Sequence, residues 1–437
     1  MRFGRARDLA PIEIVIRHSR PKSMKVGEVA MSVRRESTAT TTTLARVNQT
    51  AILELLRDSG ALSRQQIGAK TGLSPATVNR LTAALIDEGV IVAAGQEPST
   101  GGRPSVLLQY SGGARLVAAM QLHADRASGV LVDFDGKIVF RRESVFAPSD
   151  VVANGSIEER AAAQTAQLEL ITELFDSLLA MAKEMGSPAM AVGVAVPGVV
   201  RVPEGSVGSI PEFGWTDLPL GRLLRDRCDI PVIVENDANA IAFGELHRGA
   251  GKGLSSLVAI FLDRGFGAGI IANGELHRGA RAEAGEVGYL LMDRFALKRR
   301  YGESGDLEDR IGSVALTRRA IERGIPLPES GAVTAEYIFS LAREDNPAAV
   351  EIGDEILDMV SIAIASLVVV LDPELVIVGS SFLGGANEAI AAISDRLNGR
   401  IIRVPRLEPT TFGEHAVLVG VAELAVAEVN DFTYLAR

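Results

Sequence analysis

A polar pair directly after an apolar stretch is the feature best placed for chemistry. Residues 232–240 read VIVENDANA, so an apolar strand is expected to end at Asn236 and Asp237, with a helix of small residues following. In open α/β folds, ligands bind beyond the carboxyl ends of strands. A carboxylate there could accept a proton from a ligand hydroxyl as a general base, or could only hydrogen-bond to it. An ordinary helix N-cap would show the same residues.

A second group of polar side chains lies between residues 283 and 308. Glu286 and Tyr289 are three residues apart in EAGEVGY, so one helical turn would place them on the same face. Glu308 follows in GDLEDR. If these groups lie near Asn236 and Asp237, they would suit a ligand that carries many hydroxyl groups. A solvated surface turn would have the same spacing, so both interpretations stay open.

The pattern near the N-terminus is typical of nucleic-acid binding. N-cap residues Ser63 and Ser74, a Gly-containing turn and Pro75 at a helix start predict a helix-turn-helix. Two strands around a Gly- and Pro-rich tip would complete a wing. The predicted helices and strands are Leu44–Arg57, Arg64–Thr71, Pro75–Glu88, Val90–Ala94 and Ser105–Tyr110. The side chains of the third helix expected to point inward are Val78, Leu81, Leu85 and Ile86.

The second helix of such a motif lies in the major groove, with its early residues facing the base edges. The candidate base contacts are Ala76, Thr77, Asn79 and Arg80. Asparagine can pair with adenine and arginine with guanine. Ser63 and Arg64 are candidate phosphate contacts, and Arg103 at the wing tip could enter the minor groove. DNA binding is favoured over a protein-interaction module because turn, caps and wing agree.

Residues 115–430 alternate between strand and helix patterns, which predicts an α/β fold. Two stretches, GVLVDFDGKIV and GAGIIANGEL, share a glycine, an apolar strand, a turn and a returning strand. This weak internal repeat predicts two related lobes, and a cleft between lobes is a natural ligand site. The predicted organisation is a flexible basic tail over residues 1–43, a winged helix-turn-helix over 44–110 and a two-lobed body over 111–437. The longest apolar run, residues 361–371, is interpreted as a buried helix.

Charge and composition agree with this division. Residues 1–110 carry 15 Lys and Arg against 9 Asp and Glu, a net of +6, so the remaining residues carry −16 of the overall −10. A basic front on an acidic body fits a DNA-binding head. The single cysteine, Cys228, excludes a disulfide framework and a zinc site of several thiolates. No apolar run is long enough to span a bilayer, and the sequence predicts a cytoplasmic protein without a metal, a cofactor or a membrane partner.

The combination of these motifs resembles the ROK family, which includes sugar kinases and sugar-responsive repressors. The features that match in family order are the helix-turn-helix with its GGRP wing, the VPG loop at 196–198, ENDANA, the GEVG turn and DPELVIVG at 372–379. The head resembles the repressor branch, because stand-alone kinases of this family lack it. The resemblance covers about residues 44–430 and implies the two-lobed actin-like, hexokinase-like ATPase fold.

The resemblance also implies roles for individual residues. Asn236 and Asp237 match the sugar-binding asparagine and the catalytic aspartate of the kinases, and Gly198 lies in the loop near the sugar. Glu286 matches a sugar-contacting glutamate, and Glu308 matches the glutamate of a G-C-x-E motif. Tyr289 stands where the family has a histidine that binds both zinc and sugar; its hydroxyl could take over the sugar contact with altered selectivity. With Asp306 at a cysteine position of the zinc loop, no zinc site is expected.

Both phosphate motifs of the kinases are altered. Residues 121–125 read QLHAD where the family resembles D-x-G-G-T, and Asp263 replaces the first glycine of G-T-G-x-G-A-G. Two like charges about 4 Å apart repel by roughly 1–4 kcal/mol between water and surface dielectric. A triphosphate carries several such charges. The remaining glycines of 262–269 could still cradle phosphate or could only form a hairpin.

The sequence therefore favours a sugar-responsive regulator that binds operator DNA as a homodimer or homotetramer. Its effector would be a sugar or a sugar derivative. An active sugar kinase, with Asp237 as general base and ATP as donor, is the alternative. A third possibility is a sugar-binding scaffold whose head binds protein.

Overall fold

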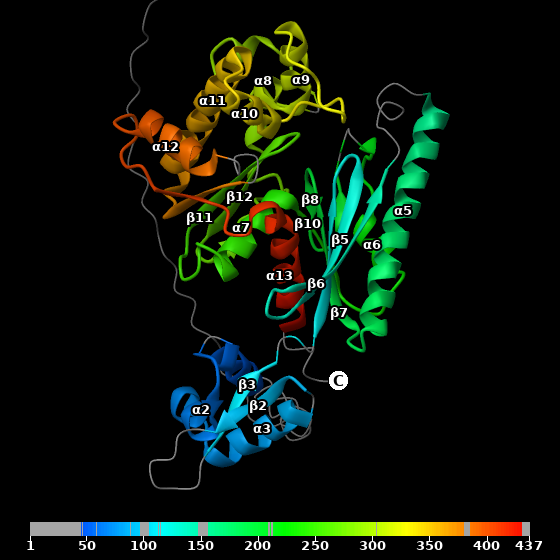
Figure 1. Ribbon diagram of the computed structural model, residues 1–437, viewed down its shortest axis with the longest axis vertical. Helices are drawn as coiled ribbons and strands as arrows, with labels where there is room; N and C mark the ends of the chain where they lie inside the picture. The colour runs from blue at the N-terminus through cyan, green and yellow to red at the C-terminus, as the bar shows by residue number, and fades with distance from the viewer. Residues whose placement is uncertain are drawn as a thin grey trace, which may run out of the picture.

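The computed structural model describes residues 45–430 except 46, 58, 88, 97–104, 112, 114, 147–155, 209, 211–212, 303 and 380–384. A small N-terminal unit lies against one end of a larger two-lobed body (Figure 1). Among the helices described, none combines the length and apolar character that a bilayer span requires.

The N-terminal unit is a winged helix-turn-helix. A helix over residues 47–57 precedes its named elements: β1 (Leu62–Ser63), α2 (Arg64–Thr71), α3 (Pro75–Asp87), β2 (Ile91–Gln96) and β3 (Val106–Tyr110). The strands form an antiparallel sheet in the order β1-β3-β2. As predicted, Ser63 caps α2: its side chain accepts from the Gln66 amide, while the Gln66 side chain accepts from the Ser63 amide. Pro75 begins α3, and the Ser74 hydroxyl accepts from the Thr77 amide at 3.3 Å.

One detail of the predicted packing of α3 is wrong. Val78, Leu81 and Leu85 are buried as expected, but Ile86 is 38% exposed. Ile86 lies about 100° around the helix from Leu85, outside the stripe that faces the core. In the helix over residues 47–57, Ile52 and Leu56 are fully buried.

The first lobe is a five-stranded sheet in the order β10-β7-β4-β5-β6. Its strands are β4 (Leu116–Leu122), β5 (Arg126–Asp133), β6 (Ile138–Val145), β7 (Ala189–Val196) and β10 (Val232–Asn236). The strand, turn and returning strand predicted for GVLVDFDGKIV are confirmed, because β5 and β6 pair antiparallel. β4 also pairs antiparallel with β5, whereas β7 and β10 run parallel to β4. Smaller elements beside this sheet are β8 (Val200–Arg201), β9 (Ser206–Val207) and α6 (Leu220–Arg225).

Successive residues of a strand point to opposite faces, so the nearly continuous buried runs of β4, β5 and β7 show that this sheet is buried on both faces. The face of the sheet that carries Met120 packs with Leu174 of α5 (Ile157–Glu184). The opposite face, which carries Val117, packs with the helices at the centre of the body. The close approach of α5 requires a glycine: a Cβ at Gly129 would lie 2.8 Å from a methyl carbon of Leu178.

The second lobe is built around a sheet in the order β13-β12-β11-β14-β15. Its strands are β11 (Leu257–Leu262), β12 (Phe266–Ala272), β13 (Glu275–Leu276), β14 (Leu375–Val378) and β15 (Arg406–Pro409). The helices on its outer side are η3 (Val287–Tyr289), η4 (Ala296–Lys298), α8 (Glu308–Ile311), α9 (Ser313–Glu322), α10 (Ala335–Arg343), α11 (Pro347–Leu371) and α12 (Ala386–Leu397). The expected helix at 361–371 is the end of α11, but it is not wholly buried: Ile364 is inaccessible, while Val369 and Val370 are 66% and 78% exposed. An all-apolar run has no polar stripe that would reveal which side faces solvent.

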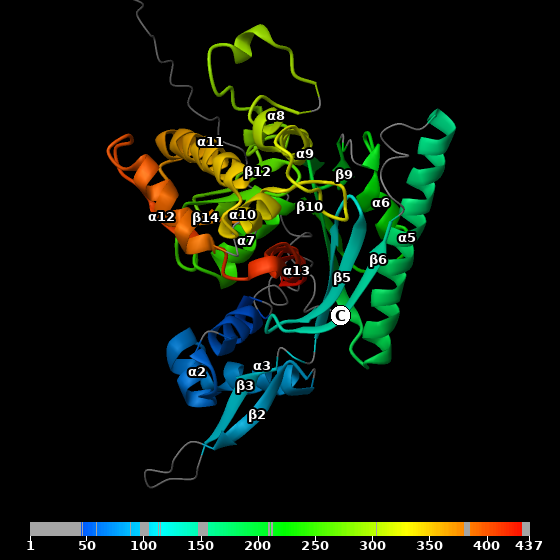
Figure 2. The ribbon, with the colours of Figure 1, turned by 45° about the horizontal axis from the view of Figure 1, so that its top comes forward.

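Two helices fill the space between the lobes. They are α7 (Asp237–Arg248) and α13 (Ala416–Asn430), the second preceded by the short turn η6 (Gly413–His415). Their apolar side chains share one core with Val117 of the first sheet and with Ala259 and Leu375 of the second. Figure 2 shows α13 between the two lobes, close to the N-terminal unit.

These two helices touch through their backbones. A Cβ at Gly420 of α13 would lie 1.9 Å from the carbonyl oxygen of Ala240 in α7, and one at Gly244 would lie 2.8 Å from the Cα of Gly420. Only glycine at these positions permits the observed crossing.

Substituting Gly420 with alanine is therefore expected to destabilise the protein by about 1–3 kcal/mol or more, because the added methyl must push α7 aside. Urea unfolding of the full chain measures the loss. Gly302→Ala is the matched control, since Gly302 has open space around it and no positive φ. Equal stability of the two variants would contradict the observed crossing.

Candidate functional site

Asn236 lies where β10 ends and α7 begins, as the sequence predicts. Its side-chain oxygen accepts from the Asn239 amide at 3.1 Å and so caps α7, while its side-chain nitrogen donates to the Gly198 carbonyl at 3.0 Å. Gly198 has a φ of +78° in the turn after β7. Asn236 thus serves as the helix cap and also fixes the loop that the sequence places beside the ligand.

Glu235 supports this junction and was missed by the sequence analysis. Its side chain is 1% exposed and forms an ion pair with Arg278 at 2.7 Å. Its other oxygen accepts from the Asn236 amide and from the Asn239 side chain, at 2.9 and 3.0 Å. A buried carboxylate requires partners, and a glutamate inside the apolar run VIVEN was the signal that one existed. These contacts fix the end of β10 before any ligand arrives.

Asp237 is the first residue of α7, directly after β10. One of its oxygens accepts from the Ala238 amide at 2.9 Å. Burial raises the pKa of Asp237 to about 8, and the neighbouring charges of Asp263 and Glu286 act in the same direction. At neutral pH the carboxyl group is therefore largely protonated, so it can both donate and accept a hydrogen bond.

A pH dependence of stability follows for Asp237. Its ordinary pKa of 3.8 applies in the unfolded chain, so between about pH 4 and pH 8 the native state holds a proton that the unfolded state lacks. Stability from this group is full below pH 4, falls as the pH rises towards 8, and is constant above. Asp237→Asn should remove this slope: its free energy of unfolding relative to the wild type should be higher at pH 8.5 than at pH 5. Asp395→Asn, an exposed aspartate, is the control; an unchanged difference at the two pH values would refute the assignment.

Glu286 and Tyr289 lie at η3, and Glu308 lies at the start of α8. Burial raises the pKa of Glu286, and its charge in turn raises that of Asp237, so these two groups are close. Glu308 begins α8, and a Cβ added at Gly265 or Gly288 would lie 2.8 or 2.7 Å from its carboxylate oxygens. The structure thus places Glu308 between the β11–β12 turn and η3.

The Tyr289 side chain has a protein partner of its own. Tyr289 is 44% exposed, and its hydroxyl donates to the Gly302 carbonyl at 3.1 Å. The predicted one-turn spacing from Glu286 is present, because Val287–Tyr289 is a 3-10 turn. A ligand contact through this hydroxyl would have to share or replace the bond to Gly302.

The segment that matches a phosphate loop of the kinases is the β11–β12 hairpin, and its glycines allow close contact with other parts of the same chain. β11 and β12 pair antiparallel up to Leu262 and Phe266. A Cβ at Gly269 would lie 2.1 Å from the Ala238 carbonyl oxygen of α7. Gly269 is therefore required by the packing of β12 on α7, whether or not a phosphate binds nearby.

Carboxylates gather around this hairpin. Burial raises the pKa of Asp263; the charges of Arg264 and Arg126 lower it, and the charge of Asp125 raises it further. Residues 121–125 therefore lie near the turn at Asp263, so the two altered phosphate segments are neighbours. Glu336 of α10 is also close, because its pKa is raised by burial and then by Asp263. A nucleotide triphosphate at this position would meet these negative charges.

Asp306, at the position of a zinc-loop cysteine, is a buried hydrogen-bonding centre with an exposed fraction of 0%. It accepts from the Tyr301 hydroxyl at 2.6 Å and from the Met292 amide at 2.8 Å, and it forms an ion pair with Arg310 at 3.0 Å. Among the described residues no cluster of His, Cys, Asp and Glu could hold a metal ion. The hydrogen bonds and the ion pair of Asp306 hold the segment between η3 and α8 in place, next to Glu308.

The head presents a polar stripe along α3. Ala76, Asn79 and Arg80 are exposed and Thr77 is partly exposed, on the side of the helix opposite Val78. Ser63 and Arg64 lie at the start of α2, and both side chains have partners within the head. Ser63 is 1% exposed with its hydroxyl used in the α2 cap, so that hydroxyl does not face solvent.

Arg64 links the two helices of the motif, since its Nε donates to the Thr82 hydroxyl at 2.8 Å. Part of its guanidinium group is therefore occupied within the head. Arg103 and the predicted wing tip lie outside the described residues.

A winged helix-turn-helix on a two-lobed α/β body, with polar groups converging at the carboxyl end of β10, defines a kinase-like ligand-binding body that carries a DNA-binding head. The chain belongs to the ROK family: residues 148–428 match that family, and residues 46–92 match the winged helix-turn-helix DNA-binding family.

Known relatives agree with this assignment. A xylose repressor of Caldicellulosiruptor bescii is 27% identical over 405 residues, covering 90% of this chain and 98% of the relative. A ROK family transcriptional regulator, a homolog of the E. coli MLC protein, has the same fold, with a TM-score of 0.69 at 22% identity over 90% of this chain and 98% of that structure. A ROK glucokinase from Streptomyces griseus, solved with glucose and AMPPNP, has a TM-score of 0.57 at 26% identity and covers 71% of this chain and 99% of that structure.

Proposed function

We propose that this chain is a sugar-responsive transcriptional repressor. The observation that carries the proposal is the presence in one chain of an exposed polar stripe on α3 and of the Asn236–Asp237 site between the lobes. The similarity to a xylose repressor along nearly its whole length supports it. Sugar in the cleft would weaken operator binding by the head.

The proposed sugar contacts are Gly198, Asn236, Asp237, Glu286, Tyr289 and Glu308. The protonated Asp237 carboxyl group and the Asn236 amide offer both donors and acceptors, which suits a sugar hydroxyl. The acidic surroundings favour an uncharged sugar over a sugar phosphate. D-Xylose is the first sugar to test because of the relative that bears its name.

The proposed operator contacts are Ala76, Thr77, Asn79, Arg80, Arg64 and Arg103, with Ser63 contributing through its place at the start of α2. Two heads of a dimer would read two half-sites about 34–36 Å apart, so a small change in head spacing would abolish binding. We therefore include a homodimer or homotetramer in the proposal.

Removing the base-reading side chains tests the DNA part directly. Asn79→Ala and Arg80→Ala should each weaken binding by about 1–3 kcal/mol, because each deletes a bidentate contact to a base. Fluorescence anisotropy on DNA fragments that the wild-type chain selects from a random-sequence library gives the affinities. Arg222→Ala, an arginine whose side chain is 79% exposed on the body, is the control. Wild-type chains that select no consensus sequence, or variants that bind like the control, would contradict the proposal.

Phosphoryl transfer is the competing function, favoured by the retained Asp237 and by the similarity to the glucokinase. We expect no saturable binding of Mg-ATP in calorimetry and no sugar-dependent release of ADP, because Asp263 replaces a glycine of the phosphate motif and Asp125 and Glu336 lie near it. The sugars to include are D-xylose, D-glucose and N-acetyl-D-glucosamine. ADP release that Asp237→Asn abolishes would establish a kinase instead.

A further inference from the structure

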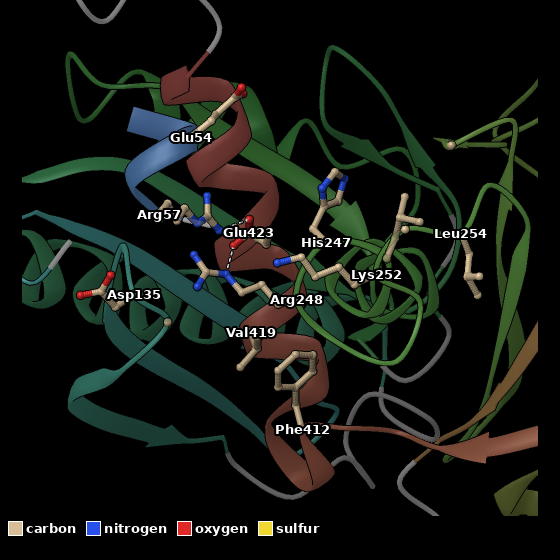
Figure 3. A pocket seen from close by; sticks show the side chains of 14 residues that line it. Glu54, Arg57, Asp135, His247, Arg248, Lys252, Leu254, Phe412, Val419 and Glu423 are labelled. Atoms are coloured by element: carbon tan, nitrogen blue, oxygen red, sulfur yellow. Dashed lines mark hydrogen bonds and ion pairs between the residues drawn. The ribbon is translucent and has the colours of Figure 1, made fainter. Parts of the chain in front are cut away.

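The N-terminal unit meets the body at an open cleft of about 750 Å³. Its lining includes the helix over residues 47–57, the β5–β6 turn at Asp135 and Gly136, the C-terminal end of α7 with the loop that follows it, and the first half of α13. Figure 3 shows the side chains of Arg57 and Arg248 turned toward Glu423 of α13, while Asp135 lies apart from this group.

Glu423 links the head to the body. One of its oxygens accepts from Arg57 of the head at 3.0 Å, and the other is paired with Arg248 of α7. Arg248 also donates to the Phe134 carbonyl at 2.7 Å. The Glu423 side chain is 8% exposed and that of Arg248 is 15% exposed, so these contacts are largely shielded from solvent. Burial would raise the pKa of Glu423, but Arg248 and Arg57 together hold it below its ordinary value.

Helix α7 joins this junction to the candidate sugar site. Asp237 is its first residue and Arg248 its last, so one helix of 12 residues, about 18 Å long, separates the two positions. A rigid helix moves as a unit, and a shift of its N-terminus is therefore passed to Arg248.

Two features prevent α7 from moving without α13. The backbones of the helices meet at Gly244 and Gly420, one turn before Glu423. The fully buried Glu245 of α7 also accepts from the Thr410 hydroxyl at 2.8 Å and from the Thr411 amide at 2.6 Å, in the segment that leads into α13. The pair α7–α13 thus behaves as one body that carries the sugar site at one end and Glu423 at the other.

A second contact gives the head a pivot. Tyr110, the last residue of β3, packs against the core of the head and against the core shared by α7 and α13. Burial raises the pKa of Tyr110 to about 12, so its ring remains uncharged in this apolar position. Tyr110 and the Arg57–Glu423 pair are thus two separate contacts between the head and the body, and together they hold the orientation of the head.

We propose that sugar occupancy is transmitted to the DNA-binding head by α7 and α13 through the Arg248–Glu423–Arg57 chain of contacts, with Arg57 as a positioning residue for the response. This inference rests on the proposed function, because it assumes that sugar controls DNA binding. Arg57 touches neither the candidate sugar contacts nor the polar stripe of α3. Its removal should therefore disconnect the two sites while leaving each able to bind its own ligand.

The test compares the wild type with Arg57→Ala and Arg57→Lys in the full chain. Anisotropy measures affinity for the library-selected DNA with and without D-xylose, D-glucose or N-acetyl-D-glucosamine, and calorimetry measures sugar affinity without DNA. Typical coupling between sites changes affinity about 5–150-fold. In Arg57→Ala this factor should fall to about one, while affinity for each ligand alone changes less than about threefold. Arg57→Lys should retain part of the response.

Controls separate this inference from a general loss of structure. Arg227→Ala removes an arginine–carboxylate pair, with Asp176, that is more exposed than the Arg57–Glu423 pair and does not involve the residues of the junction, and it should respond like the wild type. Glu423→Gln tests the same contact from the other side and should not add to the effect of Arg57→Ala. A full response in Arg57→Ala, or an equal loss in Arg227→Ala, overturns the relay. A wild type that binds selected DNA without responding to any of the sugars instead overturns the proposed function.

Discussion

Helices α7 and α13 cross with no side chain between them at Gly244 and Gly420, and they do so in the layer that separates the two sheets. Both lobes pack on this pair, so neither helix can shift without moving the other. The first residues of α7 belong to the candidate sugar site. The last residue of α7, Arg248, pairs with Glu423 in the middle of α13, and Glu423 contacts the head through Arg57. A movement of α7 at the candidate sugar site would therefore also move Arg248 at the junction between body and head.

The chemistry of the cleft fits sensing better than phosphoryl transfer. Asn236 and Asp237 are held in place by Gly198, Glu235 and their own helix, so the polar groups are arranged before a ligand binds. The glycines of the β11–β12 hairpin accommodate α7 and Glu308, while Asp263 puts a buried carboxyl group where the kinase motif has a glycine. Burial that keeps Asp237 protonated suits hydrogen bonding to a hydroxyl and opposes proton abstraction at neutral pH.

Much of this arrangement was predictable from the sequence. Period-3.6 spacing, caps and turn residues predicted the helix-turn-helix, and the strand-to-helix switch placed Asn236 and Asp237 correctly. The orientation of Ile86 and the exposed end of α11 were not predictable, because adjacent apolar residues leave the rotation of a helix undetermined. The partners of Arg64 and Tyr289 also escaped prediction, since local spacing does not identify tertiary neighbours. The Arg57–Glu423 contact joins residues 366 positions apart and left no local signal.

The central claim is that the cleft and the polar stripe of α3 are coupled through the body. Thermodynamic linkage requires that coupling be reciprocal. Calorimetric titration of D-xylose, or of whichever sugar in the panel binds, into the protein alone and into its complex with selected DNA measures this most directly. The account predicts that DNA weakens sugar affinity by the same factor by which sugar weakens DNA affinity. Identical sugar affinity in the two titrations would contradict it.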